Sequence, residues 1–446
     1  MLAFALILGY VMLVLVRPQE YPAWAGNAPP VMPVFLALAL VAWIASRSKR
    51  FDAPQYLLLA AFTLATSLSV LVNGWSGGAL AQLSTFTPTF LAFLLLANAT
   101  DNAQRLRLVM CLFALAAGLL ALHGIFQKRD GIGWTGMPLV DDGRIQYVGI
   151  FSDPNDLGML FVICLPMALY LSQRGGAFGL RRLFWAALAG LLLYGIWLTN
   201  SRGSMLAVVA MVGAWLWIRR GPVLAGLLGA AALVGMRMMP SRLSDLSVQE
   251  SSASGRVDAW YEGFRMFVSH PVFGVGTGRF TDFHWLTAHN SLVLVLAENG
   301  IIGFMLWVAF VGYCFWMMLR LLRHRPDAGL EEAGDGAFGE GMPATEIDED
   351  AAWEAALEWE ADRRIALTLL LSLVGFATTA FFLSRTYVVL PYLLAALVVA
   401  HFGAVRRRYG GIAGFSLTSD APRWALYMGL VLAGFYVLLK LLLGMS

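Results

Sequence analysis

Long apolar runs recur along almost the whole chain, and they restrict the folds that it can adopt. Of its residues, 59% are hydrophobic and only 13% are charged, whereas a soluble globular domain has about a quarter of its residues charged. A helix needs about 20 mostly apolar residues to cross a bilayer. Because backbone groups inside a bilayer must be satisfied internally, we expect an all-α, polytopic integral membrane protein.

Roughly thirteen segments have the composition of membrane-spanning helices. They lie near residues 2–16, 31–46, 55–73, 79–97, 106–126, 157–172, 181–198, 203–218, 222–238, 300–321, 364–384, 386–403 and 423–443. We expect a bundle of about 12–13 such helices and a large external loop with amphipathic helices.

This pattern divides the chain into five parts. They are an N-terminal bundle of about nine spans (1–238), a loop proposed to be catalytic (239–299), one span (300–323), an acidic flexible insertion (324–363) and the C-terminal spans (364–446). The end of the insertion, residues 350–364, has the spacing of a short amphipathic helix that lies on the membrane surface. A solvated linker is favoured over a partner-binding segment.

Positive charges occur in alternate loops. Cytoplasmic loops are enriched in Lys and Arg. We therefore expect the cytoplasm on the side that holds Arg47–Arg50, Arg105, Arg107, Arg174, Arg181, Arg182, Arg219, Arg220, Arg320 through Arg325 and Arg406–Arg408. Loops 17–30, 73–78, 127–156, 199–202, 239–299 and 384–386 then face outward. The net charge of +3 follows from this topology and does not indicate nucleic-acid binding.

The sequence contains no motif for a metal or a cofactor. Cys111, Cys164 and Cys314 lie in apolar spans and form no CxxC pair. A P-loop, HExxH, GxSxG, DxD and a dinucleotide fingerprint are all missing, which argues against a cytoplasmic nucleotide-sugar donor. A transporter is disfavoured because, apart from Lys440, the helix centres hold almost no ionisable residues.

Polar residues gather in the external loop between residues 255 and 303. They include Arg256, Trp260, His270, Arg279, His284, His289, Asn290 and a glycine-rich turn from His270 to Gly278. Permanent cations, imidazoles and glycines suit a polyanionic ligand. Ser252 to Ser254 are expected to cap an amphipathic helix whose apolar face carries Val257, Trp260 or Tyr261, Phe264 and Phe267.

His289 precedes a helix that we expect Asn290 or Ser291 to cap. The positive end of that helix disfavours imidazolium, so a neutral base is available near pH 7. Outside the loop, Arg202 follows the cap residue Ser201, and Asp153 with Pro154 begins another helix. Taken singly, each has a structural explanation: an arginine meets lipid headgroups, a histidine caps a helix, and Asp153 caps its own.

Four blocks in this order resemble the O-antigen ligase and polymerase superfamily. They are Gly149-Ile-Phe-Ser-Asp-Pro-Asn155, Ser201-Arg202-Gly203, Gly255-Arg256 with Trp260 and the His270–Gly276 turn, and Ala288-His289-Asn290 followed by Glu298-Asn-Gly300-Ile-Ile-Gly303. The resemblance covers about residues 145–320. The acidic insertion departs from the usual pattern of the family.

The resemblance implies a glycosyltransferase in the bacterial inner membrane with its active site facing the periplasm. It implies an undecaprenyl-diphosphate-linked glycan as donor and, in a ligase, lipid A-core as acceptor. His289 is then the expected general base, with Arg202 and Arg256 on the diphosphate. Expected substrate contacts are Asn155, Trp260, Arg279, His284, Asn290 and Arg385. A repeat polymerase and a protein O-glycosylating ligase use the same donor, so they remain alternatives, as does a lipid-linked glycan transporter.

Overall fold

The protein forms helices throughout the residues that the structure describes. The computed structural model describes residues 1–24, 27–47, 49–140, 143–173, 176, 178–238, 246–324, 349–409 and 411–444. Its α-helices are α1 (Leu2–Val16), α2 (Val31–Ile44), α3 (Pro54–Val72), α4 (Ser76–Ala99), α5 (Ala103–Asp130), α6 (Pro154–Ser172), α7 (Leu180–Thr199), α8 (Arg202–Arg220), α9 (Pro222–Met238), α10 (Leu246–Ser269), α11 (Phe280–Phe283), α12 (Ser291–Arg323), α13 (Glu349–Ala380), α14 (Leu390–Arg408) and α15 (Leu417–Gly444). The predicted all-α polytopic fold is confirmed.

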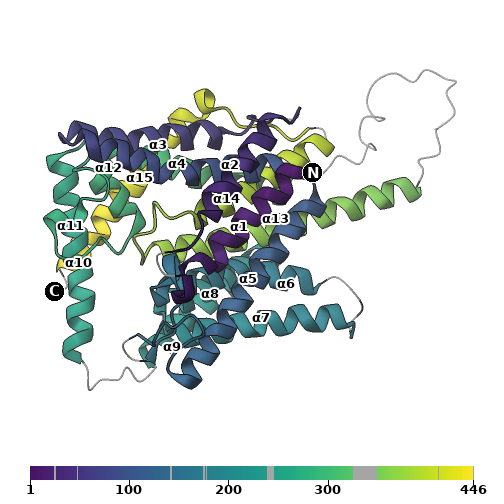
Figure 1. Cartoon of the computed structure of the whole chain (residues 1–446), viewed down its shortest axis with the longest axis horizontal. Coiled ribbons are helices and arrows are strands. Elements are labelled where there is room, and N and C mark those ends of the chain that lie inside the picture. Colours follow the sequence, from purple (N-terminus) through teal and green to yellow (C-terminus); the bar gives the residue numbers. More distant parts are fainter. Residues whose placement is uncertain are drawn as a thin grey trace.

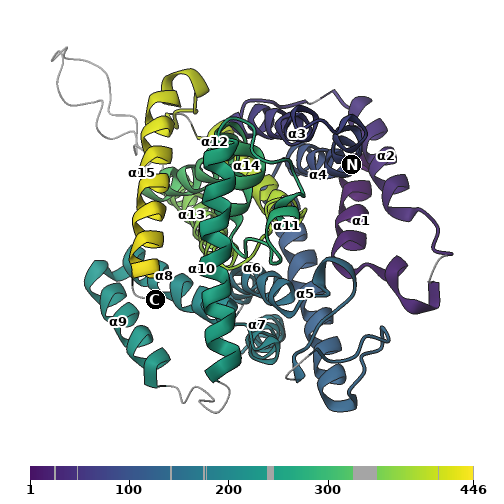
Figure 2. The same ribbon diagram turned by 90° about the vertical axis from the view of Figure 1, so that its left-hand side faces the viewer.

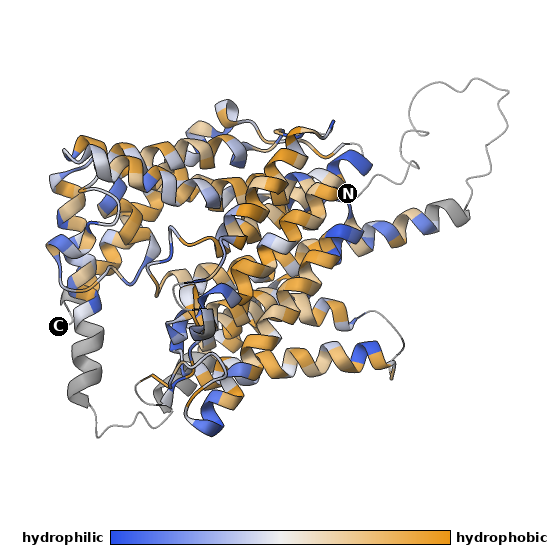
Figure 3. Cartoon of the chain, viewed as in Figure 1, coloured by the Kyte–Doolittle hydropathy of each residue, from blue (hydrophilic) through white to orange (hydrophobic). Residues whose placement is uncertain are grey.

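Each apolar segment predicted to span the membrane forms a helix. In the described part of the chain, 10 helices are long and apolar enough to cross a bilayer. Of the others, α2 has 14 residues and α9 has 17, and α8 is not among the 10. Hydrophobic residues cover the long helices and hydrophilic ones gather towards their ends and in the connections (Figure 3). Most of α6 and α14 is buried, so these spans form the centre of the bundle.

Loops predicted to share a side of the membrane contact one another. At one end of the bundle, Asn73 Nδ2 donates to Gly274 O at 2.9 Å, and the Tyr21 and Tyr147 hydroxyls are 2.5 Å apart. Arginine-rich segments meet elsewhere: Arg320 Nη1 donates to Ala413 O at 2.7 Å. Each of these contacts joins segments that the charge pattern assigns to the same side of the membrane.

Helix α10 crosses the ends of the long spans instead of running beside them (Figures 1 and 2). The predicted start of this helix at Ser252 to Ser254 is wrong, because α10 already begins at Leu246. Trp260 is buried and Val257 and Phe264 pack against the same cluster, as expected, while Ala259 and Met266 are also buried there. An amphipathic helix in this position covers the bundle end and presents Arg256 there.

Two other boundaries differ from the sequence-based division. Helix α12 begins at Ser291, so the division expected between 299 and 300 falls inside it. Helix α13 is continuous from Glu349 to Ala380. The predicted surface helix at 350–364 is therefore wrong as a separate element, because it extends a span (Figure 1). Of the acidic insertion, residues 325–348 lie outside the described residues.

The glycine-rich turn packs into a kink of α12. Gly300 has φ 60° and ψ −159°, which interrupts the helical backbone. The turn bonds to the groups around the kink: Ile301 N donates to Pro271 O at 2.8 Å, and Val275 N donates to Ala297 O at 3.0 Å. The backbone groups freed by the kink are thus satisfied within the bundle, as a membrane environment requires.

Buried polar side chains complete this junction. The Thr277 hydroxyl lies 2.8 Å from both Thr66 O and Asn299 Oδ1, and Asn299 Nδ2 donates to the Tyr387 hydroxyl. Glu298 is only 2% exposed, and its Oε1 accepts from Phe280 N at 3.1 Å. Since these bonds join α3, the turn, α12 and the α13–α14 connection, they fix the start of α12 relative to that connection.

Replacement of Gly300 by alanine should destabilise this junction. A Cβ there would lie 2.5 Å from the Val272 carbonyl group, and the residue has a positive φ. We expect a loss of about 2–3 kcal/mol or more, measured as a lower thermal midpoint of the purified chain. Gly434→Ala is the control, because nothing lies within 4 Å of its added Cβ; equal midpoints for the two variants would contradict the packing argument.

Candidate functional site

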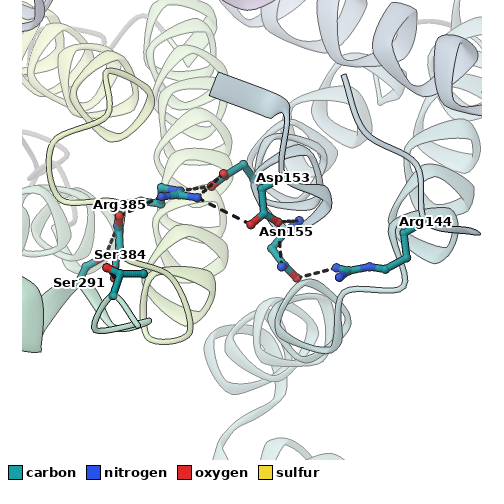
Figure 4. Close-up of polar contacts among 8 residues, drawn as sticks. Arg144, Asp153, Asn155, Ser291, Ser384 and Arg385 are labelled. Carbon is teal, nitrogen blue, oxygen red and sulfur yellow. Dashed lines mark hydrogen bonds and ion pairs between the residues drawn. The ribbon is translucent and has the colours of Figure 1, made fainter. Parts of the chain in front are cut away.

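The first turn of α6 begins the polar cluster at the outward-predicted end of the bundle. Asp153 caps α6 and Pro154 follows at the first helical position, as predicted. Asp153 Oδ1 accepts from the backbone N and the side-chain Nδ2 of Asn155 at 2.7 and 2.9 Å. Asn155 Oδ1 in turn accepts from Arg144 Nη2 at 3.0 Å (Figure 4). Asn155 therefore holds the turn together, and its predicted substrate contact stays a prediction.

The start of α8 lies beside the start of α6. Ser201 caps α8, accepting from Ser204 N at 3.3 Å. An added Cβ on Gly158 of α6 would meet Ser204 Oγ at 2.3 Å. Arg144 bridges the same region, since its Nε donates to Thr199 O at 2.8 Å. Arg202, the first residue of α8, is thereby placed at the cluster with an exposed side chain.

Arg385 ties the α13–α14 connection to α6. Its guanidinium makes a two-pronged contact with the Asp156 carboxylate, with Nη2 2.6 Å from Oδ2, and Asp153 Oδ2 lies 3.9 Å away (Figure 4). The Asp156 side chain is only 5% exposed, so it depends on this partner. The backbone N of Arg385 donates to Ser291 Oγ at 2.9 Å, which extends the link to the start of α12.

His289 stands immediately before α12 in a left-handed conformation with φ 46°. Such a φ is uncommon for a residue other than glycine and is held by the surroundings. On one side, Trp260 Nε1 donates to Ala288 O at 2.9 Å. On the other, Asn290 caps α12, accepting from Leu292 N and Val293 N at 2.9 and 3.2 Å. The backbone on either side of the imidazole is thus fixed.

Charged groups from five segments share this region. Burial lowers the pKa of the Arg256 guanidinium, and the neighbouring Arg202 lowers it further; it remains protonated at neutral pH. Burial also lowers the pKa of His289, followed by the charge of Arg256, while Asp153 opposes the shift. The three predicted catalytic residues therefore lie in one electrostatic neighbourhood, and their roles remain predictions.

Three helix N-termini also point into this region, those of α6, α8 and α12. Gly203 of α8 lies against Phe382 of the α13–α14 connection. In the same connection, Leu383 O accepts from Ser291 Oγ at 2.6 Å, which links the connection to the start of α12. The positive ends of helix dipoles and unpaired backbone N–H groups favour anions. With Arg144, Arg202, Arg256 and Arg385 against the carboxylates of Asp153 and Asp156, the region favours a polyanion.

The other predicted contact residues lie outside this cluster or are buried. Arg279, which precedes α11, pairs with Asp282 at 2.8 Å, and His284 stacks on Trp285. Among the described residues, neither contacts Arg202, Arg256 or Arg385. Trp260 is 6% exposed and Asn290 is fully buried. The geometry of Trp260 and Asn290 fits residues that position His289, and a direct substrate contact stays a prediction for all four.

Sequence reasoning missed Arg144 and assigned no pairing to Asp153 and Asp156. Arg144 had a usable signal, because it is an arginine in an outer loop of a chain that places its arginines mostly on the other side. Asp156 is an ionisable residue in the first turn of an apolar span, which by itself calls for a partner. The sequence could not identify that partner, because Arg385 lies 229 residues further along the chain.

Replacing Arg385 alone should destabilise the protein more than replacing Arg385 and Asp156 together. Arg385→Ala leaves Asp156 buried without a counter-charge, at a cost of about 2–4 kcal/mol. Arg385→Ala combined with Asp156→Ala should regain part of this, and a double-mutant cycle on thermal midpoints measures the coupling. Arg265→Ala is the control, since its partner Glu262 is 3.2 Å away at the surface; additive effects at Arg385 and Asp156 would contradict a coupled buried pair.

One comparison with known protein families finds a match to part of the chain. Residues 186–308 match the family described as O-antigen ligase. This segment runs from α7 into α12 and contains Arg202, Arg256 and His289. A search of curated proteins finds no match. The similarity to the O-antigen ligase family therefore rests on residues 186–308, which lie within the helical membrane bundle.

Proposed function

We propose that the protein is an O-antigen ligase that moves a glycan from undecaprenyl diphosphate to a sugar hydroxyl of lipid A-core. The reaction takes place at the periplasmic face of the bacterial inner membrane. The observation that supports it most is the joint position of Arg202, Arg256 and His289 at a junction of helix N-termini, inside the segment that matches the family. A diphosphate is the anion that such a junction suits.

Arg202 and Arg256 bind the diphosphate in this proposal. Among the described residues, neither forms an ion pair or a side-chain hydrogen bond, so their donors are available to a ligand. Arg144 and Arg385, by contrast, are engaged with Asn155 and Asp156. The two engaged arginines shape the site, while the two unengaged ones offer planar forks of donors matched to phosphate oxygens.

His289 accepts the proton of the attacking hydroxyl. A lowered pKa keeps the imidazole neutral at pH 7, as a general base requires. In one displacement with inversion, the acceptor oxygen bonds to the anomeric carbon as the bond to the diphosphate oxygen breaks. The proton passes to His289, and the leaving diphosphate keeps the electron pair. Its developing charge is stabilised by the guanidinium groups, so the proposed step requires no divalent metal.

A shallow apolar groove lies beside the cluster, between α10, α12 and α15. It is lined by Phe264, Leu292, Val293, Leu296, Phe304, Val431, Leu432 and Phe435, and its enclosed volume is only about 10 Å³, so a lipid tail would lie along its surface. Phe264 follows Arg256 by about two helical turns, roughly 12 Å along α10. Leu292 follows His289 within a turn of α12. In this proposal, the first part of the polyprenyl tail lies against this apolar surface, next to the diphosphate.

The pH dependence of transfer tests the role of His289. His289→Ala should reduce kcat about 10²–10⁴-fold. In the wild type, kcat/KM should fall only as the pH drops through the lowered pKa of His289, below the usual value near 6.5. Arg256→Gln removes a charge that lowers this pKa, so its acidic limb should shift to higher pH. Full activity of His289→Ala on purified donor and acceptor would refute the role.

Lipopolysaccharide from a deletion strain tests the acceptor and the arginine chemistry together. Loss of the whole ladder with accumulation of lipid-linked polymer indicates a ligase, whereas core plus one repeat would indicate a polymerase and overturn the proposal.

Complementation of the same strain tests the arginine chemistry, and wild-type protein should restore the ladder. Arg202→Lys should not, because a point charge lacks the two-pronged phosphate contact. Arg219→Lys, in the last turn of the same helix, should restore the ladder as the control.

A further inference from the structure

Trp285 is an exposed aromatic residue on an anchored segment. It lies between α11 and His289 and is 77% exposed. The segment itself is well fixed: Phe280 and Ala288 are buried, and His284 Nδ1 is 3.1 Å from both Leu286 N and Leu286 O. Since burying an aromatic side chain is strongly favourable, a fixed segment that leaves an indole exposed indicates a surface for a ligand.

The indole lies at the rim of the arginine cluster. A Cβ added to Gly255 would lie 3.8 Å from Trp285 Cζ2 and 3.2 Å from Leu286 Cδ1. Gly255 directly precedes Arg256 in the sequence, and Trp285 lies four residues before His289. On the other side of the segment, Thr287 Oγ1 lies 2.9 Å from Ser384 Oγ, next to Arg385. The indole therefore lies beside α10, and the segment that carries it also contacts the α13–α14 connection.

The surroundings of Trp285 suit a sugar. His284 stacks on the indole with ring centroids 5.8 Å apart and planes at 28°, which holds the orientation of the ring. Arg279 and Asp282 form an accessible ion pair on α11, close in sequence. A pyranose ring combines C–H groups, which are attracted to an aromatic face, with hydroxyl groups, which hydrogen bond to charged neighbours.

We propose that Trp285 is a stacking platform for a pyranose ring of the glycan next to the reacting bond, an inference that rests on the proposed function. This ring belongs either to the first sugar of the donor or to the accepting sugar. An indole at this rim holds the sugar while Arg202 and Arg256 hold the diphosphate. The main competing role is an aromatic anchor at the membrane surface. If Trp285 were such an anchor, Phe283, which is 48% exposed and two residues away in the sequence, would act as an anchor as well.

The experiment uses the full chain in liposomes, with undecaprenyl-diphosphate-linked glycan and lipid A-core as substrates. Trp285→Ala should raise the KM of one glycan substrate roughly tenfold, the size expected for one stacked ring. Trp285→Tyr, which keeps an aromatic face, should retain most of the affinity. Phe283→Ala should leave both KM values unchanged. Inhibition by undecaprenyl diphosphate, which carries no sugar, should be the same in all variants.

The outcomes separate the possible roles. A raised donor KM assigns the platform to the donor sugar, and a raised acceptor KM assigns it to the acceptor. Unchanged KM values in Trp285→Ala would overturn the platform, as would equal losses in Trp285→Ala and Phe283→Ala or weaker inhibition by undecaprenyl diphosphate. If the wild-type protein neither transfers glycan nor binds undecaprenyl diphosphate, the proposed function itself is refuted.

Discussion

The ion pair between Asp156 and Arg385 is the contact on which the geometry of the site depends. A buried carboxylate is tolerated only with a partner, and here the partner comes from the connection between α13 and α14. Because the backbone of Arg385 also bonds to Ser291, one contact joins the first turns of α6 and α12. Asp153, next to that pair, and His289, next to Ser291, are placed as a consequence.

A second constraint is that the site must bind an anion at the end of an apolar bundle. Four arginines gather there with two carboxylates, and two of the arginines are already committed to structural contacts. Burial and then the charges of Arg256 and Arg385 lower the pKa of His289, while the charge of Asp153 opposes the shift. The same arrangement thus serves two purposes, since it attracts a diphosphate and keeps the imidazole neutral.

Much of this organisation could be predicted from the sequence, and the exceptions share a cause. Apolar runs predicted the helices, and the local caps at Asp153, Ser201 and Asn290 are confirmed, because both depend on residues close in the chain. The continuity of α13 and the early start of α10 were missed, since polar residues at a helix end give no sharp boundary. Long-range packing decided that Asp156 pairs with Arg385, 229 residues away, and no local pattern encodes that pairing.

A structure of the full chain with bound undecaprenyl diphosphate tests the central claim most directly. The account predicts diphosphate oxygens within hydrogen-bond distance, about 2.7–3.2 Å, of the guanidinium groups of both Arg202 and Arg256. The imidazole of His289 should face the diphosphate, and the lipid tail should enter the groove between α10, α12 and α15. A diphosphate bound at the opposite end of the bundle, or one that leaves both arginines without contact, would contradict the account.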